Sequence, residues 1–212
     1  MKKILALMMA LCLMIPAVSI AAERNKALEK AIKKERTTKM KELKKGKWEL
    51  FGSSRTLEVA LLKHWDNLDK LGDDGSEEVG VATSFKSKNI GHQMAVNNAI
   101  TNYAQKAGST LKGRVVSDMQ ANGTEPGSEF DHFYAAYERL VEKEIKNEMT
   151  ESFSIIRPNA DGTYEMQTFF IVSEDAASKA RLRALESAAA ESEAAQRYAD
   201  KIAGFVRAGF EN

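Results

Sequence analysis

The sequence contains few of the residues that support redox, metal or covalent chemistry. Of its 212 residues only Cys12 is a cysteine, and only three are histidines. The chain beyond Cys12 therefore has no thiol to form a disulfide, act as a nucleophile or bind a soft metal. Beyond the N-terminal stretch, no run approaches the roughly 18 apolar residues that a membrane-spanning helix requires.

The N-terminal stretch is predicted to be a secretory signal peptide covering residues 1–21. A positively charged start precedes the apolar run Ile4–Val18, and Ser19–Ala21 places small residues at both positions that signal peptidase reads. A retained membrane anchor is the alternative, although the run is short for a bilayer of ~30 Å. Leu11 before Cys12 does not fit a lipidation site. The predicted location is the periplasm or the cell envelope.

Charge is divided unevenly along the rest of the chain. Residues 23–47 carry eleven Lys and Arg against four Glu, a net charge of +7, whereas residues 48–212 have a net charge of −8. A basic arm beside an acidic body favours self-association, binding to an envelope protein, or contact with an anionic membrane surface. A helix with solvated charges is the alternative. Nucleic acid is not an expected partner of an exported protein with an acidic body.

Hydrophobic periodicity predicts helices and strands in alternation. The predicted helices cover 24–45, 57–71, 90–119, 130–145 and 173–207, and the predicted strands cover 48–51, 79–85, 152–157 and 163–172. Ser53 or Ser54 is expected to cap the second helix. The pair Asp161-Gly162 predicts a tight hairpin with a positive φ at Gly162.

This order of elements predicts the α+β class, with a small, mostly antiparallel sheet of about four strands packed by helices. The predicted division is a signal peptide (1–21), a basic helical arm (22–47), an α+β domain (48–173) and a long Ala-rich C-terminal helix (174–212). Alanines in the last segment are spaced for close helix contact, at positions 177, 180, 184, 188 and 195. The terminal helices are expected to extend from the core or to pair with each other.

Two motifs that could bind ions depart from the patterns that the chemistry needs. The segment 108–115 resembles a phosphate loop, but Arg114 and Val115 stand where Lys and Ser or Thr are required. Acidic residues crowd the loop around position 73, namely Asp69, Asp73, Asp74, Glu77 and Glu78. Their spacing does not match a calcium loop, because Leu71 occupies the third place. A solvated acidic turn is the simpler interpretation.

The remaining candidates are histidines and aromatic residues. His64, His92 and His132 fall on three different predicted helices without the spacing of a zinc site, so a site would require convergence in space. Partly buried structural histidines are the alternative. An aromatic set could line a ligand groove, but its helical spacing favours the core: Phe130, Phe133, Tyr134 and Tyr137. No catalytic, cofactor or metal-binding residue is predicted, and no G-x-S-x-G elbow is present.

A set of structural motifs resembles a known family. Glu78-Val-Gly-Val-Ala82 leads into an Ala-bearing helix, and Asp161-Gly-Thr-Tyr-Glu165 opens a strand that ends Phe169-Phe-Ile-Val172. Across residues 48–176 the chain resembles the small exported lipoproteins of the LPP type, whose fold is similar to the N-terminal domain of the flagellar T-ring protein. The resemblance implies a compact α+β envelope domain without catalytic residues. The chain departs from the family in lacking a lipidation motif.

These observations predict an exported envelope or periplasmic protein that acts through binding or assembly and not through catalysis. The alternative is a periplasmic hydrolase of envelope or imported polymers, with a site assembled from scattered carboxylates and histidines. A cleft that gathers two titratable side chains would favour the hydrolase.

Overall fold

A computed structural model describes residues 17–210 of the chain. The chain divides into two compact units, with the boundary between Lys47 and Trp48. Most of the predicted signal peptide lies outside the described residues. Within residues 17–210, every helix is too short or too polar to cross a membrane.

Among the described residues, the first unit contains the helix α2 (Ala17–Lys45). Its sequence is rich in Lys, Glu and Ala, which favour helix, and Lys44 and Lys45 in the last turn complement the helix dipole. The helix ends before Gly46, and Lys47 has a left-handed backbone with φ 55°. The predicted helix over 24–45 is confirmed, and the described helix also includes residues 17–23.

The second unit is built on a four-stranded antiparallel sheet with the order β1-β3-β4-β2. The strands are β1 (Glu49–Phe51), β2 (Gly75–Phe85), β3 (Met149–Pro158) and β4 (Tyr164–Ser173). The central pair β3 and β4 is a hairpin, and β2 lies antiparallel to β4 with Gly80 opposite Thr168. The predicted α+β class is confirmed.

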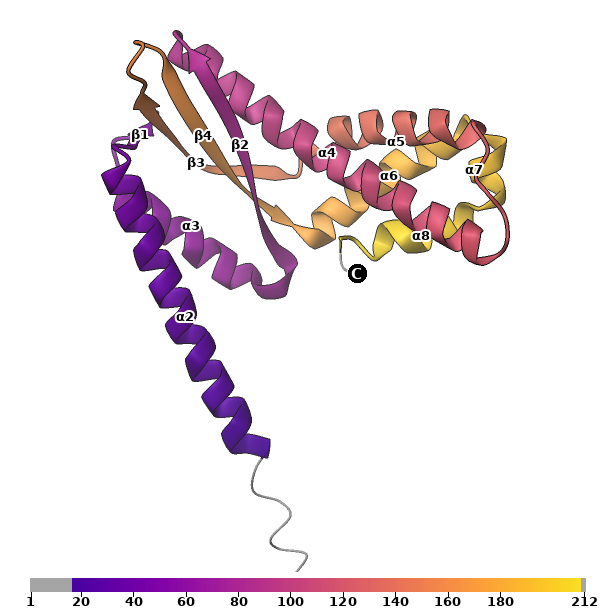
Figure 1. The fold of residues 1–212 in the computed structure, drawn as a ribbon, viewed down its shortest axis with the longest axis horizontal. Coiled ribbons are helices and arrows are strands. Elements are labelled where there is room, and N and C mark those ends of the chain that lie inside the picture. Colours follow the sequence, from indigo (N-terminus) through magenta and orange to yellow (C-terminus); the bar gives the residue numbers. More distant parts are fainter. Residues whose placement is uncertain (1–16, 211–212) are drawn as a thin grey trace, which may run out of the picture. The chain divides into compact units, whose positions relative to one another are not determined.

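Helices cover the sheet and continue beyond it as a separate bundle (Figure 1). The sheet packs against α3 (Leu57–Leu71) and against the first half of α4 (Lys88–Ala121). The second half of α4 packs with α5 (Glu129–Ile145) and with helices from the C-terminal segment. The aromatic set of α5 is buried in this bundle, as its helical spacing favoured.

The β3–β4 hairpin turns at the predicted residues. Gly162 has φ 79°, the left-handed region that favours glycine. The Asp161 carboxylate accepts hydrogen bonds from the Thr163 backbone N–H at 2.9 Å and from the Thr163 hydroxyl at 2.6 Å. These bonds lower the pKa of the Asp161 carboxyl below its ordinary value. The predicted tight turn with a positive φ at Gly162 is confirmed.

The structure corrects the predicted single helix at the C-terminus (174–212). The segment instead forms α6 (Glu174–Ala190), α7 (Glu193–Arg197) and α8 (Ala199–Arg207). The break has a local cause, because the Ser192 hydroxyl accepts a hydrogen bond from the Ala195 N–H and starts a new helix. The chain then turns, and Ile202 and Val206 are buried in the bundle.

A smaller correction concerns the start of α3. The N-cap is Thr56, whose hydroxyl accepts a hydrogen bond from the Val59 N–H, and neither Ser53 nor Ser54 has this role. Thr56 stands immediately before the first helical residue, and therefore its hydroxyl can reach the N–H three residues later.

Candidate functional site: an open strand edge

The edge of strand β3 is only partly covered. Strand β1 is three residues long and pairs with Ser154, Ile155 and Ile156. Within the part of the chain that the structure describes, no strand pairs with Met149–Phe153 on that same side. An uncovered strand edge presents backbone N–H and C=O groups that can pair with another chain.

Local backbone geometry explains why β1 stops short. Gly52 follows the last residue of β1 and has φ 69°, so the chain leaves the sheet there. Thr56 then starts α3 within a few residues. On the opposite strand, the register between β3 and β4 shifts between Glu151 and Phe153, which marks a β-bulge. Bulges are common next to binding and active sites because they re-aim side chains.

A groove of about 470 Å³ follows the open edge. Its walls come from the end of β1 and the turn after it, from α3, and from residues 150–154 of β3. The exposed side chains that line it include Arg55, Lys63, Asn67 and Thr150. This volume lies within the range of ligand pockets, roughly 300–1,000 Å³. The groove therefore has room for side chains beside the strand edge.

The other edge of the sheet is protected. The Asn98 side chain of α4 donates a hydrogen bond to the Val81 carbonyl of β2 at 2.7 Å. The register between β2 and β4 shifts after Ala82, and β2 also carries the charged residues Glu77 and Glu78. Side-chain caps, bulges and charges are the means by which proteins keep an edge from pairing. The β3 edge is bordered instead by a groove.

A network of polar side-chain contacts lies at the groove. The Ser154 hydroxyl donates to a Glu151 carboxylate oxygen at 2.7 Å, and His92 Nε2 of α4 lies 3.0 Å from the same carboxylate. Ser154 Oγ also lies 3.0 Å from the Thr168 hydroxyl. Serine, glutamate and histidine are therefore brought together, with the carboxylate between the other two. This contact was not predicted, because Glu151 and His92 are 59 positions apart in the sequence.

His64 lies in the core under the sheet. Its Nε2 is 2.5 Å from a carboxylate oxygen of Glu77, and its ring packs edge-on against Phe153 and Phe169. Among the described residues, Nδ1 has no hydrogen-bond partner. A buried imidazole of this kind is held in place by one carboxylate and two aromatic rings, as expected for a structural histidine.

The three histidines do not converge. His64, His92 and His132 lie on α3, α4 and α5, as predicted, and the described chain contains no group of three or more side chains that could hold a metal ion. His132 is exposed and lines a second cavity of about 460 Å³ beside the break between α6 and α7. Glu191, Glu193 and Arg197 also line this cavity.

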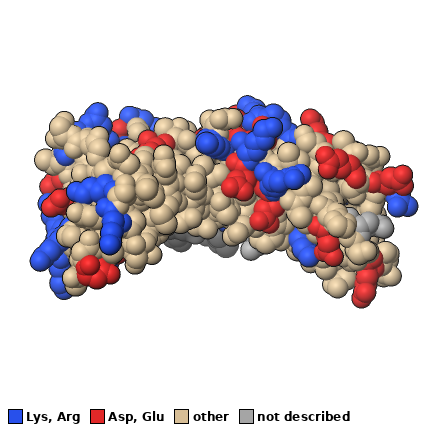
Figure 2. All heavy atoms as spheres, turned by 90° about the horizontal axis from the view of Figure 1, so that it is seen from above, with Lys and Arg blue, Asp and Glu red and all other residues tan. Residues whose placement is uncertain are grey.

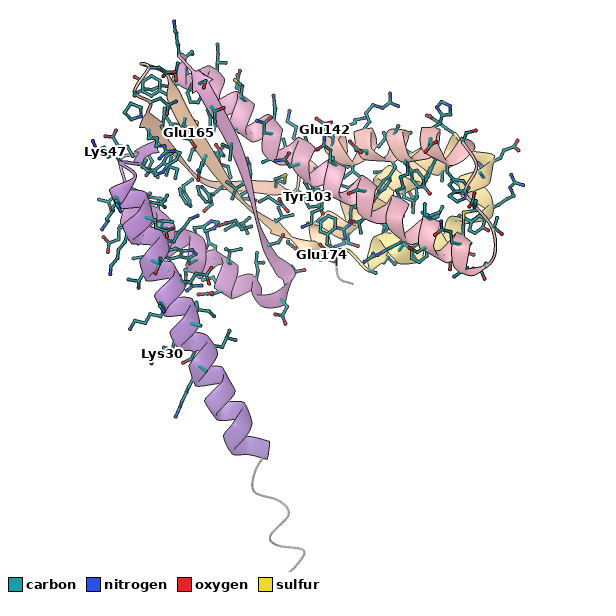
Figure 3. The ribbon with its side chains drawn as sticks, in the orientation of Figure 1. Lys30, Lys47, Tyr103, Glu142, Glu165 and Glu174 are labelled. Atoms are coloured by element: carbon teal, nitrogen blue, oxygen red, sulfur yellow. The ribbon has the colours of Figure 1, made fainter. Side chains whose placement is uncertain are left out.

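An ion pair between Arg181 and Glu174 connects the start of α6 to the helical bundle. The Arg181 side chain is 2% exposed and pairs with Glu174, which is 40% exposed. The Arg181 guanidinium also donates to the Tyr103 hydroxyl at 2.5 Å. Figure 3 shows Tyr103 and Glu174 close together where the sheet meets the bundle. Burial raises the pKa of the Tyr103 phenol to about 12, although Arg181 opposes the shift.

The motifs that could bind ions have structural roles instead. Arg114 lies inside α4, where its guanidinium donates to the carbonyls of Phe205 and Gly209 at 2.6 Å and 2.9 Å. In the acidic loop, Asp74 accepts hydrogen bonds from the Ser173 hydroxyl and the Asp175 N–H. These bonds lower the pKa of the Asp74 carboxyl.

Comparison with known proteins gave no match among family models, curated proteins or solved structures. The resemblance to LPP-type lipoproteins therefore stays a prediction.

Proposed function

We propose that this chain is an exported cell-envelope protein that acts as a non-enzymatic binding module. Its ligand is an extended segment of a partner protein, which adds a strand to the sheet along Met149–Phe153. One observation carries the proposal, namely that the groove of about 470 Å³ follows the part of β3 that β1 leaves uncovered. Strand addition of this kind obtains affinity from main-chain hydrogen bonds and specificity from pockets for alternate side chains.

The contacts at the groove favour binding over hydrolysis. A serine nucleophile needs a base within hydrogen-bond reach of its hydroxyl, and the substrate must be able to reach that hydroxyl. Here the Ser154 hydroxyl donates to Glu151, its side chain is buried, and the described contacts place His92 on the far side of that carboxylate. Glu151 is a base within reach, but Ser154 is only 2% exposed, so a polymer substrate cannot reach its hydroxyl and the serine has a structural role beside the groove.

The export part of the proposal has a direct test. The protein recovered from the envelope fraction should begin at or near Ala22, because signal peptidase cleaves after the small-x-small segment Ser19–Ala21. N-terminal sequencing measures this. An intact Met1 or a lipid-modified Cys12 would contradict cleaved, unlipidated export.

The binding site is tested by filling the groove. Asn67 is exposed on α3 and lines the groove, so Asn67→Trp should block access without disturbing the core. Peptides selected from a phage-displayed random library on the purified protein are then made synthetically. We expect the variant to weaken their binding roughly tenfold or more, the size of a binding hot spot. Affinity is measured by calorimetry.

A matched variant controls for the bulky residue itself. Lys70 is exposed on the same helix and lies outside the groove lining, so Lys70→Trp should leave the affinity unchanged. Amide hydrogen exchange should show new protection at Met149–Phe153 when the peptide binds. Protection confined to other segments, or equal losses in both variants, would overturn the site.

A further inference from the structure

Between Lys26 and Lys45, helix α2 presents a face that carries lysines and no carboxylates. At about 100° per residue, seven lysines project within an arc of roughly 120° around the helix axis. They are Lys26, Lys30, Lys33, Lys34, Lys41, Lys44 and Lys45, and every one of them is exposed. The three acidic residues of the same stretch, Glu29, Glu35 and Glu42, fall outside this arc. Figure 3 labels Lys30 on this helix.

The arrangement differs from that of the other charged surfaces. On the second unit several cations lie beside carboxylates, as in Lys179 with Asp175 and Arg183 with Glu144. The face of the molecule that Figure 2 presents carries positive and negative groups side by side. The α2 face has one sign over its length of about 29 Å, at 1.5 Å per residue. Unbalanced charge of one sign on a straight helix suits an extended, planar surface of the opposite sign.

We infer that the lysine face of α2 binds the surface of a bilayer that contains anionic phospholipid. The exposed apolar residues of the helix, Leu28 and Ile32, project on the other side from the lysines. The lysine face therefore lies on the lipid headgroups through electrostatic attraction. It does not insert into the hydrocarbon, because it carries no large apolar side chain. Each lysine near an anionic surface contributes a factor of about five in affinity. This binding is a separate activity from strand addition at β3.

The test uses the full mature chain and vesicles of two compositions. Vesicles of phosphatidylcholine with phosphatidylglycerol should co-sediment the protein, and vesicles of phosphatidylcholine alone should not. The triple variant Lys30→Gln, Lys33→Gln and Lys34→Gln should bind the anionic vesicles roughly 100-fold more weakly. Glutamine is as good a helix former as lysine, so far-UV circular dichroism should be unchanged. Salt near 1 M should also release the protein, because the Debye length falls to about 3 Å.

A matched triple variant separates the helix face from net charge alone. Lys86→Gln, Lys143→Gln and Lys146→Gln remove the same charge from exposed positions of the second unit, and the affinity should stay within about threefold. Equal losses in the two triple variants would overturn the inference, as would equal binding to both kinds of vesicle. Tighter binding to a single-stranded RNA oligonucleotide than to anionic vesicles would overturn it as well.

Discussion

Replacing Gly80 by alanine is expected to lower the free energy of unfolding by about 3 kcal/mol, the upper end of the range for overpacking. Strand β2 crosses α4 so closely at Gly80 that an added Cβ would lie 1.8 Å from the Ala95 carbonyl oxygen and 2.9 Å from the Ala99 nitrogen. Both atoms belong to the helix backbone and cannot rotate away. The helix would have to separate from the sheet, and thermal or urea denaturation would measure the cost.

A glycine within α4 itself, Gly113, is the control. An added Cβ at Gly113 meets nothing within 4 Å, and this residue is exposed in the helix interior. Gly113→Ala should therefore raise stability by about 0.5–1 kcal/mol through helix propensity. If Gly80→Ala were as stable as the wild type, the close approach of β2 to α4 would be contradicted.

Removing the carboxylate of Glu174 is expected to cost about 2–3 kcal/mol of stability. Glu174→Ala leaves the Arg181 cation buried, with the Tyr103 hydroxyl and the Val206 carbonyl as hydrogen-bond acceptors and the centroid of the Phe210 ring 5.2 Å away. Breaking a buried pair by removing one partner costs about 3–5 kcal/mol, and the value here is lower because Glu174 is half exposed. Chemical denaturation of the purified variant measures the change.

Two further variants make this expectation specific. Asp175 also lies in the first turn of α6, but its pair with Lys179 is exposed, so Asp175→Ala should change stability by no more than about 1 kcal/mol. The double variant Glu174→Ala, Arg181→Met should recover part of the loss, because an apolar side chain replaces the lone buried cation. A double variant less stable than Glu174→Ala would show that the buried Arg181 cation does not require the Glu174 carboxylate.

The elements that the sequence predicted correctly are those set by local patterns. Helix α5 follows from its aromatic spacing, and the hairpin follows from Asp161-Gly162, whose backbone preference is a property of the two residues. The break at Ser192 was missed because alanine on both sides favours helix, and one capping serine competes with it only when the turned chain can bury Ile202 and Val206. That burial is a property of the tertiary structure.

The candidate site was not predictable for a similar reason. An open strand edge is defined by what does not pair with it, so it depends on the length of β1 and on the turn at Gly52. The residues of Met149–Phe153 do not by themselves show that one edge of this part of the strand is left unpaired. The contact between His92 and Glu151 likewise depends on the position of α4 over the sheet. Only the lysine spacing of α2 could be read directly from the sequence.

Helix α4 has a consequence for how the second unit unfolds. Its first half packs on the sheet and its second half on the bundle, as one uninterrupted helix of 34 residues (Figure 1). The Arg114 side chain of α4 donates hydrogen bonds to the backbone carbonyls of Phe205 and Gly209, which joins the C-terminal residues to α4. Neither half of the unit can therefore melt without exposing part of the other's core, and denaturation is cooperative across both. A partner held at the β3 edge would thus stabilise helices far from its contact.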